Sequence, residues 1–341
     1  MIDLELLKRL SDASGGSGNE EEVRTILKEE INKVTEAKID GIGNVFGSIG
    51  HGPRVLAVGH MDEVGFMVRA IDNDGKIRFS NVGFVFNVGI TCQLVTIVTS
   101  TGKKVDGVVA HSHGTGMKEY PPIDKLWIDI GASSKDEVLN EGIEVGNSII
   151  WKNNFKEFRN NLLIGKAWDN RIGCAISVKA LQEVKDSSLK VTFIGGGTVQ
   201  EEVGCRGARA LGISVKPDIA FSLDTSPCFD EEGSEIGKGP QIFVMDSGVI
   251  AHKKLLEYVK KIAKENNIPY QLCLLGRGGT DASEFQNISG GCPSVCIGIP
   301  VKYIHSPTSM ISYSDYENGV KLLVKILESL DEQKIEEIKS F

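Results

Sequence analysis

Apolar side chains recur along the chain with a period that changes more than once. Residues 19–34 carry them three or four positions apart, which predicts an amphipathic helix with Asn19 as its N-cap. The run 53–60 is mostly apolar and ends at His60, which predicts a short buried strand. The first part of the chain therefore indicates a fold that contains both helices and strands.

The pattern between residues 64 and 155 is different. Short alternating or continuous apolar runs are separated there by Gly, Asn and Asp, a texture typical of strands joined by turns. Only the stretch 134–142 resembles a helix. This segment predicts an all-β domain inserted into the chain.

After about residue 160, helical and strand-like patterns alternate. Expected helices cover 170–184, 204–212, 248–266 and a last segment with Val320, Leu323, Leu327 and Leu330 in register, and expected strands cover 189–195, 218–224, 270–275 and 294–300. Strands that alternate with helices predict a largely parallel sheet covered on both faces. We therefore expect an α/β fold, a mostly parallel sheet flanked by helices, with an inserted all-β domain.

The composition is that of an ordinary folded protein, with 341 residues, 41% hydrophobic and 25% charged. Lys and Arg number 38 against 46 acidic residues, so the net charge of −8 provides no broad cationic surface for nucleic acid. No run of 18 apolar residues occurs, which argues against a membrane span, and the first residues lack the apolar region of a signal peptide. We expect a cytoplasmic protein with neither nucleic-acid nor membrane partners.

Six side chains able to bind metals or transfer protons fall at strand ends or at a helix start. They are His60 and Asp224 at the ends of their strands, Glu201 and Glu202 after the strand at 189–195, His305 after the strand at 294–300, and Asp169 before the helix that opens at Asn170. In open α/β sheets, ligands bind beyond the carboxyl ends of the strands, so we expect these groups at one rim. Imidazole and carboxylate donors suit a borderline divalent ion such as zinc, cobalt or manganese, and one Asp can bridge two ions.

Each of these residues also has a simpler explanation when it is taken alone. A single His at a strand end is commonly a hydrogen-bonded structural residue, and an adjacent pair of Glu residues commonly faces solvent. Asp62 follows His60 by two positions, so it either accepts a hydrogen bond from the imidazole or caps the strand end as a turn residue. The joint placement of two His and four acids favours the metal-site interpretation.

The motifs around these residues occur in a fixed order: HMDEVGF at 60–66, KAWDNRIG at 166–173, TVQEEVGCRGA at 198–208, FSLDTSP at 221–227, GRGGTDAS at 276–283 and YIHSP at 303–307. Together they resemble the dinuclear metallo-aminopeptidases of the tetrahedral or glutamyl aminopeptidase family, whose members are often labelled endoglucanases. The resemblance runs from about residue 5 to residue 330. It implies a metallopeptidase-like sheet with an inserted β-barrel-like domain.

The resemblance also implies a role for each candidate residue. His60 and Asp224 would hold one metal ion, Glu202 and His305 the other, Asp169 would bridge both, Glu201 would be the general base and acid, Asp62 would support His60, and Gly279, Thr280 and Asp281 would contact substrate. The cofactors would be two divalent ions per subunit, zinc or cobalt in the first place and manganese as a further option. Many relatives have an acid where this chain has Asn170 and Ala where it has Gly59, but neither position is a ligand.

The same resemblance predicts a domain division and an assembly. Residues 1–63 and 159–341 would form the catalytic domain, and residues 64–158 an inserted dimerisation domain. Relatives build dimers into hollow tetrahedral dodecamers, so we expect a homo-oligomer here. The stretch 111–124, which includes His111 and His113, resembles a loop that relatives lend to a neighbouring active site, and a third metal site at these two histidines is the less favoured explanation.

The expected function is that of a metal-dependent aminopeptidase, which hydrolyses N-terminal residues from short peptides with a water activated by two divalent ions. A glycoside hydrolase is the first alternative, although the aromatic content is only 6% and the acids occur together with two His. A non-catalytic oligomeric binding protein is the second, although it would require the loss of Glu201 or of a ligand. Three points stay open: the native metal, the extent of assembly and the preferred N-terminal residue of the substrate. Arg277 and residues 229–232 could set that preference.

Overall fold

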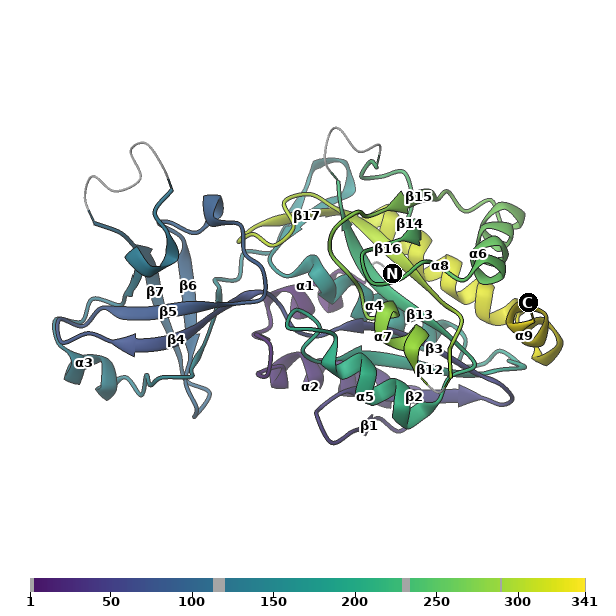
Figure 1. Cartoon of the computed structure of the whole chain (residues 1–341), viewed down its shortest axis with the longest axis horizontal. Coiled ribbons are helices and arrows are strands. Elements are labelled where there is room, and N and C mark those ends of the chain that lie inside the picture. The colour runs from purple at the N-terminus through teal and green to yellow at the C-terminus, as the bar shows by residue number, and fades with distance from the viewer. Residues whose placement is uncertain (1–2, 113–119, 229–233, 289, 341) are drawn as a thin grey trace.

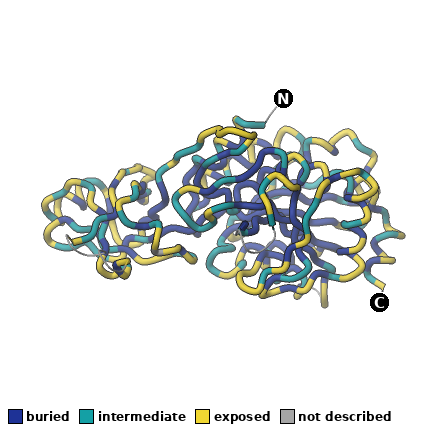
Figure 2. Tube along the Cα trace, turned by 90° about the horizontal axis from the view of Figure 1, so that it is seen from above, coloured by how far each residue is buried: buried dark blue, intermediate teal, exposed yellow. Residues whose placement is uncertain are grey.

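The structure is a computed structural model and describes residues 3–112, 120–228, 234–288 and 290–340. It has two parts, a large part built on a mixed sheet with helices and a smaller β part that projects from it (Figure 1). Figure 2 shows that buried residues gather in the interior of the larger part and that exposed residues lie mostly around its outside. None of the helices in the described ranges combines the length and the apolar character needed to cross a membrane.

The large sheet has eight strands in the order β1-β2-β12-β3-β13-β16-β14-β15. Their bounds are Lys38–Ile39 (β1), Val45–Gly50 (β2), Thr192–Thr198 (β12), Arg54–His60 (β3), Ile219–Pro227 (β13), Ser294–Val301 (β16), Gln241–Met245 (β14) and Gln271–Leu274 (β15). The pairs β12–β3, β3–β13, β13–β16 and β14–β15 are parallel, whereas β1–β2, β2–β12 and β14–β16 are antiparallel. The prediction of an α/β fold whose large sheet contains parallel strands is confirmed.

Helices cover both faces of this sheet. Their bounds are Leu4–Asp12 (α1), Glu21–Asn32 (α2), Trp168–Glu183 (α4), Arg206–Val215 (α5), Lys253–Glu265 (α6), Ala282–Asn287 (α7), Tyr313–Ser329 (α8) and Glu332–Lys339 (α9). Successive strand residues point to opposite faces, so Val55 and Ala57 of β3 pack in the core with α1, α2, α4, α6, α8 and α9, while Leu56 and Val58 pack in a second core with α5 and α7. Strands buried on both faces must be almost continuously apolar, and all eight residues of β16 are buried.

Three predicted helix positions differ from the structure. α2 begins at Glu21 rather than near Asn19, and its N-cap is Glu20, whose carboxylate accepts a hydrogen bond from the Gly18 N–H at 2.7 Å. α6 begins at Lys253 rather than at 248, because the preceding residues bridge back to β14 through Ile250. Leu330 follows the last turn of α8 instead of lying inside the helix.

The smaller part is a closed six-stranded barrel with its own core. Its strands, in order around the barrel, are β4 (Gly65–Ile71), β5 (Ile77–Val82), β8 (Trp127–Asp129), β7 (Lys104–Ala110), β6 (Leu94–Val98) and β9 (Ser148–Trp151). Phe66 lies at its centre and makes edge contacts with Phe79 and Trp151, with ring centroids 4.8 and 5.1 Å apart. The short helix α3 (Lys135–Asn140) is capped by Ser134, whose hydroxyl accepts from the Glu137 N–H.

A three-stranded antiparallel sheet leads from the barrel back to the large part. It contains β10 (Lys156–Phe158), β11 (Leu162–Gly165) and β17 (Ser309–Ser312). The chain thus leaves the large sheet just after His60 at the end of β3 and returns just before Asp169 at the start of α4. Both connections to the barrel lie beside the carboxyl ends of the parallel strands, where the candidate site residues are found.

Candidate active site

The rim of the large sheet holds a cavity of about 760 Å³ into which the six predicted groups project. His60 is the last residue of β3, Glu201 and Glu202 lie between β12 and α5, and His305 follows β16. Asp169 lies in the first turn of α4, before the backbone becomes regularly helical at Arg171. Asp224 lies within β13, which runs on to Pro227 beyond the predicted strand end. The structure therefore brings together all six side chains that the sequence indicated.

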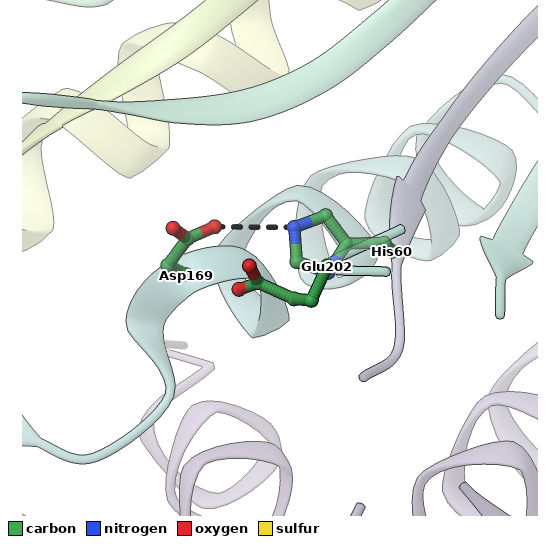
Figure 3. A group of neighbouring side chains, drawn as sticks. All are labelled: His60, Asp169 and Glu202. Atoms are coloured by element: carbon green, nitrogen blue, oxygen red, sulfur yellow. Dashed lines mark ion pairs between the residues drawn. The ribbon is translucent and has the colours of Figure 1, made fainter. Parts of the chain in front are cut away.

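Asp169 lies between the two histidines. Its Oδ1 atom is 3.2 Å from His60 Nε2, and its Oδ2 atom is 3.1 Å from His305 Nε2. Figure 3 shows the Asp169 carboxylate facing His60, with Glu202 alongside. A carboxylate that offers one oxygen to each of two imidazoles has the arrangement needed to bridge two ions.

The other donors group around these three residues. His60 Nε2 is 3.9 Å from Asp224 Oδ1, and His305 Nε2 is 3.6 Å from Glu202 Oε2. Potential ligand atoms of two sets, one of His60, Asp169 and Glu202 and one of His60, Glu201 and Asp224, lie within 4.8 Å of one another.

The chemistry of these donors fits a metal ion. Glu202 Oε1 is buried and accepts no hydrogen bond from the described residues, so it has an unused acceptor next to the imidazoles. Imidazole nitrogens together with carboxylate oxygens are the ligands preferred by zinc, cobalt and manganese in proteins. The residues present therefore fit divalent ions of this kind.

The electrostatics of the cavity point the same way. Burial raises the pKa of Glu202 and of Asp224 well above the usual value, and the nearby Asp169 carboxylate raises both further. Burial also raises the pKa of Glu201 to about 8. Burial alone would lower the pKa of His60, but the surrounding carboxylates, Glu201 foremost, raise it well above the usual value. Buried carboxylates crowded in this way need a positive charge among them, which a divalent cation provides.

Asp62 lies beside His60 and also contacts the backbone of the two glutamates. The Nδ1 atom of His60 lies nearest the backbone carbonyl oxygen of Asp62, at 3.1 Å, and 3.4 Å from its carboxylate. The Asp62 carboxylate accepts hydrogen bonds from the backbone N–H groups of Glu201 at 2.9 Å and Glu202 at 3.2 Å, and from the Ser17 hydroxyl at 2.6 Å. Asp62 therefore contacts His60 through both its backbone and its side chain, and its carboxylate also holds the backbone of the two glutamates.

The residues suggested for substrate contact are divided between the cavity and the protein interior. Gly279 and Thr280 line the cavity, as does Arg277, for which the described residues provide no ion-pair partner. Asp281 is 1% exposed and its carboxylate accepts from the Thr198 hydroxyl at 2.5 Å, so it lies behind the cavity wall rather than in it. Residues 229–232 and His113 lie outside the described residues.

Two further features of the site were missed from the sequence. Phe84 and Phe86 contact each other edge to face, with ring centroids 5.1 Å apart, and line the cavity near His305. Glu63, Lys166 and Arg171 form a buried cluster behind the rim. The sequence offered one signal for the cluster, because its charged residues lie inside the two motifs that carry His60 and Asp169.

An α/β sheet that collects two imidazoles and four carboxylates at the carboxyl ends of its strands defines a hydrolase of the metallopeptidase class. The match to known proteins gives the family. Residues 43–322 match the model of the M42 glutamyl aminopeptidases, and the chain belongs to this family. It is accordingly an aminopeptidase, a hydrolase that acts on peptide bonds, and the resemblance found in the motifs is confirmed.

Relatives with known names align over nearly the whole chain. FrvX of Escherichia coli (strain K12) is 37% identical, with 100% of this chain and 99% of FrvX covered. The glutamyl aminopeptidase of Lactococcus lactis subsp. cremoris (strain MG1363) is 33% identical, with 98% of each chain covered. The lysyl aminopeptidase of Pyrococcus furiosus is 30% identical, with 97% of this chain and 98% of the relative covered.

Solved structures resemble this fold over the same length. A TET aminopeptidase from Thaumarchaeota archaeon SCGC AB-539-E09 has a TM-score of 0.95 at 35% identity, with 98% of this chain and 99% of that chain covered. The TET1 peptidase of Pyrococcus horikoshii, which can assemble into a tetrahedron or a large octahedral shell, has a TM-score of 0.88 at 33% identity, with 96% and 99% covered. A structure named endoglucanase from Thermotoga maritima has a TM-score of 0.79 at 29% identity, with 98% and 99% covered.

Proposed function

We propose that the protein removes N-terminal residues from short peptides with the help of two divalent metal ions. The observation that carries this proposal is the Asp169 carboxylate, whose two oxygens lie 3.2 Å from His60 Nε2 and 3.1 Å from His305 Nε2 inside a cavity that also contains Glu201. Two divalent ions bound there would polarise the carbonyl group of the peptide bond and lower the pKa of a water molecule. Zinc or cobalt suits this donor set best, and manganese is a further candidate.

The assignment of the ligands follows the two sides of Asp169. His60 and Asp224 would hold one ion, His305 and Glu202 would hold the other, and Asp169 would bridge both. The sheet fixes the positions of these groups. His60 and Asp224 lie side by side because β3 and β13 are adjacent parallel strands. Such preorganisation lets the site bind ions without rearranging its backbone.

Glu201 would move the protons. It is assigned to neither ion, its Oε2 atom lies 3.7 Å from His60 Nε2, and its backbone N–H is held by Asp62. Burial raises the pKa of Glu201 to about 8, which suits a group that must take a proton from water and then donate it to the leaving amine. The same carboxylate would thus act first as general base and then as general acid.

Arg277 would select the N-terminal residue of the substrate. Its side chain lines the cavity beyond the metal ligands, and the described residues provide no ion-pair partner for it. A guanidinium that lines a cavity attracts a carboxylate and repels an ammonium group. We therefore propose a preference for acidic over basic N-terminal residues, as the name of the glutamyl aminopeptidase relative suggests and unlike that of the lysyl aminopeptidase.

The proposal also assigns a different role to each of the two parts of the chain. Residues 1–63 and 159–341 would form the catalytic domain and residues 64–158 a dimerisation domain. Leu94 and Val108 are paired on neighbouring barrel strands and are 55% and 40% exposed, so they form an apolar pair on the outer surface. Together with the assembly of the TET1 relative, this supports a homo-oligomer, up to a tetrahedral dodecamer. Leu94→Glu should then lower the mass measured by light scattering.

The test is the dependence of peptidase activity on metal and on Glu201. Protein freed of metal by chelation should lose the hydrolysis of amino-acyl p-nitroanilides and regain it with zinc, cobalt or manganese. Glu201→Gln should lower kcat by about 10²- to 10⁴-fold while the bound metal, measured by atomic emission, is retained. Full activity of the metal-free protein would refute the proposal. Release of reducing sugar from carboxymethyl-cellulose would instead revive the glycoside hydrolase alternative.

A further inference from the structure

A thiol lies against the general base. Cys205 is the N-cap of α5 and lines the same cavity, and its thiol donates a hydrogen bond to Glu201 Oε1 with an Sγ–O distance of 3.4 Å. A carboxylate oxygen of Asp281 completes a group in which the three potential ligand atoms lie within 4.8 Å of one another. None of these three residues is among the metal ligands proposed above, and only Glu201 has a role in the proposed hydrolysis.

The spacing of this group fits a small cation. Zinc bonds are about 2.3 Å to sulfur and about 2.0 to 2.2 Å to oxygen, so a tetrahedral ion separates a sulfur and an oxygen ligand by about 3.6 Å. The observed distance of 3.4 Å between Cys205 Sγ and Glu201 Oε1 is close to that value. The two side chains therefore need little movement to share an ion.

Asp281 gives an independent indication of a ligand. The residue is 1% exposed, and although its Oδ2 atom accepts from Thr198, its Oδ1 atom is buried and accepts no hydrogen bond from the described residues. A buried carboxylate oxygen without a donor is costly, and a cation between Asp281, Glu201 and Cys205 would remove that cost.

We infer that Cys205, Asp281 and Glu201 form a third cation site, specific for a thiophilic divalent ion such as cadmium or excess zinc, whose occupation inhibits the enzyme. The inhibition rests on the role proposed for Glu201, because a carboxylate that ligates an ion can no longer accept a proton from water. Binding converts the thiol to a thiolate and holds Glu201 as a carboxylate, and the protons released from both groups go to solvent. Two carboxylates and a thiolate leave the occupied site with one net negative charge beside the proposed pair of ions, which favours its occupation.

The first test measures binding rather than catalysis. Cadmium is added to protein already loaded with two equivalents of zinc, and the cadmium–thiolate charge-transfer band in the ultraviolet is recorded during the titration. Exchange of cadmium into the site of His60, Asp169 and the other nitrogen and oxygen ligands produces no such band. We expect a band that saturates at one equivalent, that is absent in Cys205→Ser, and that persists in Cys92→Ser, which removes an exposed thiol on the barrel.

The second test measures inhibition in the same samples. The activity of each variant is normalised to its own value at two equivalents of zinc. Further zinc or cadmium should inhibit wild type and Cys92→Ser. The inhibition constant should be at least about tenfold higher in Cys205→Ser and Cys205→Ala. A band or an inhibition constant that is unchanged in both Cys205 variants would overturn the inference and leave the aminopeptidase function intact. A thiolate band in a protein without peptidase activity would instead support the cation site and contradict the proposed function.

Discussion

Glu63 neutralises two buried cations behind the rim of the active site. Its Oε1 atom accepts from Lys166 Nζ at 2.6 Å and from Arg171 Nη2 at 2.8 Å, and the three side chains are at most 2% exposed. Lys166 also donates to the carbonyl oxygen of Ala13 at 2.7 Å, and Arg171 to that of Leu10 at 2.7 Å. The cluster thus ties the N-terminal segment to the loop after β3 and to the start of α4.

We predict that Glu63→Gln lowers the free energy of unfolding by about 3 kcal/mol. The amide keeps the shape of the side chain but leaves two buried cations without a counter-charge, and the loss of one partner from a buried ion pair costs about 3 to 5 kcal/mol. Lys166 can escape part of this cost by releasing its proton, because burial lowers its pKa to about 8 even with the Glu63 carboxylate beside it. Arg171 cannot release its proton, so its share remains.

The assay is guanidinium unfolding followed by tryptophan fluorescence, since the fully buried Trp168 lies two residues from Lys166. The matched control is Glu328→Gln, because the Lys325–Glu328 pair of α8 has the same 2.6 Å separation but side chains that are 39% and 35% exposed. That substitution should cost less than about 1 kcal/mol, since exposed pairs contribute little. If Glu63→Gln cost no more than Glu328→Gln, the reasoning from burial would be refuted.

Three further predictions concern the same framework and its chemistry. Burial lowers the pKa of Lys166 from 10.5 to about 8, so the unfolded chain binds more protons than the folded protein between these pH values. The free energy of unfolding of wild type should therefore rise by up to about 3 kcal/mol relative to that of Lys166→Met between pH 8 and pH 10.5. An equal difference between the two proteins at both pH values would contradict this. Asp62→Asn should lower kcat by about 10- to 100-fold, because the Glu201 and Glu202 N–H groups bind different oxygens of Asp62 and the amide nitrogen would face one of them, and a wild-type kcat in steady-state assays would exclude the positioning role. Arg277→Glu should lower the ratio of kcat/KM for glutamyl over lysyl p-nitroanilide by at least about tenfold, and an unchanged ratio would remove Arg277 from substrate selection.

The sequence pointed to residues that line one cavity because most of them lie at or just beyond strand ends. A buried parallel strand is a short apolar run, and the first polar residue after it, such as His60 after β3, marks the rim of the sheet. The period of apolar residues likewise located α4, α5 and α8 within a few residues. Element boundaries depend on individual hydrogen bonds, and there the pattern failed, as at Asn19, because the N-cap is Glu20 and no side chain caps the first turn of α2.

The parts that the sequence could not provide are contacts between distant segments. The Glu63–Lys166 pair joins residues 103 positions apart, and the Asp62 carboxylate meets the N–H of Glu201 across 139 positions. No periodicity records such a pairing, because it depends on which strands become neighbours in the sheet. The antiparallel insertion of β14 between β16 and β15 was invisible for the same reason, since each of these strands is locally an ordinary apolar run.

The register between β12 and β3 explains how such distant residues form one precise site. Thr198 pairs with His60 in this parallel ladder, and the Met61 N–H donates to the Thr198 carbonyl oxygen at 2.7 Å. Glu201 follows Thr198 by three residues and therefore arrives beside the imidazole, where Asp62 binds its backbone. A slip of one residue would turn every side chain of β12 to the opposite face and break this contact, so the core that fixes the register also fixes the catalytic geometry. The barrel enters the chain after His60 and leaves it before Asp169, so the pairing of β12 with β3 is formed entirely by strands of the large sheet, while Phe84 and Phe86 of the inserted segment line the cavity.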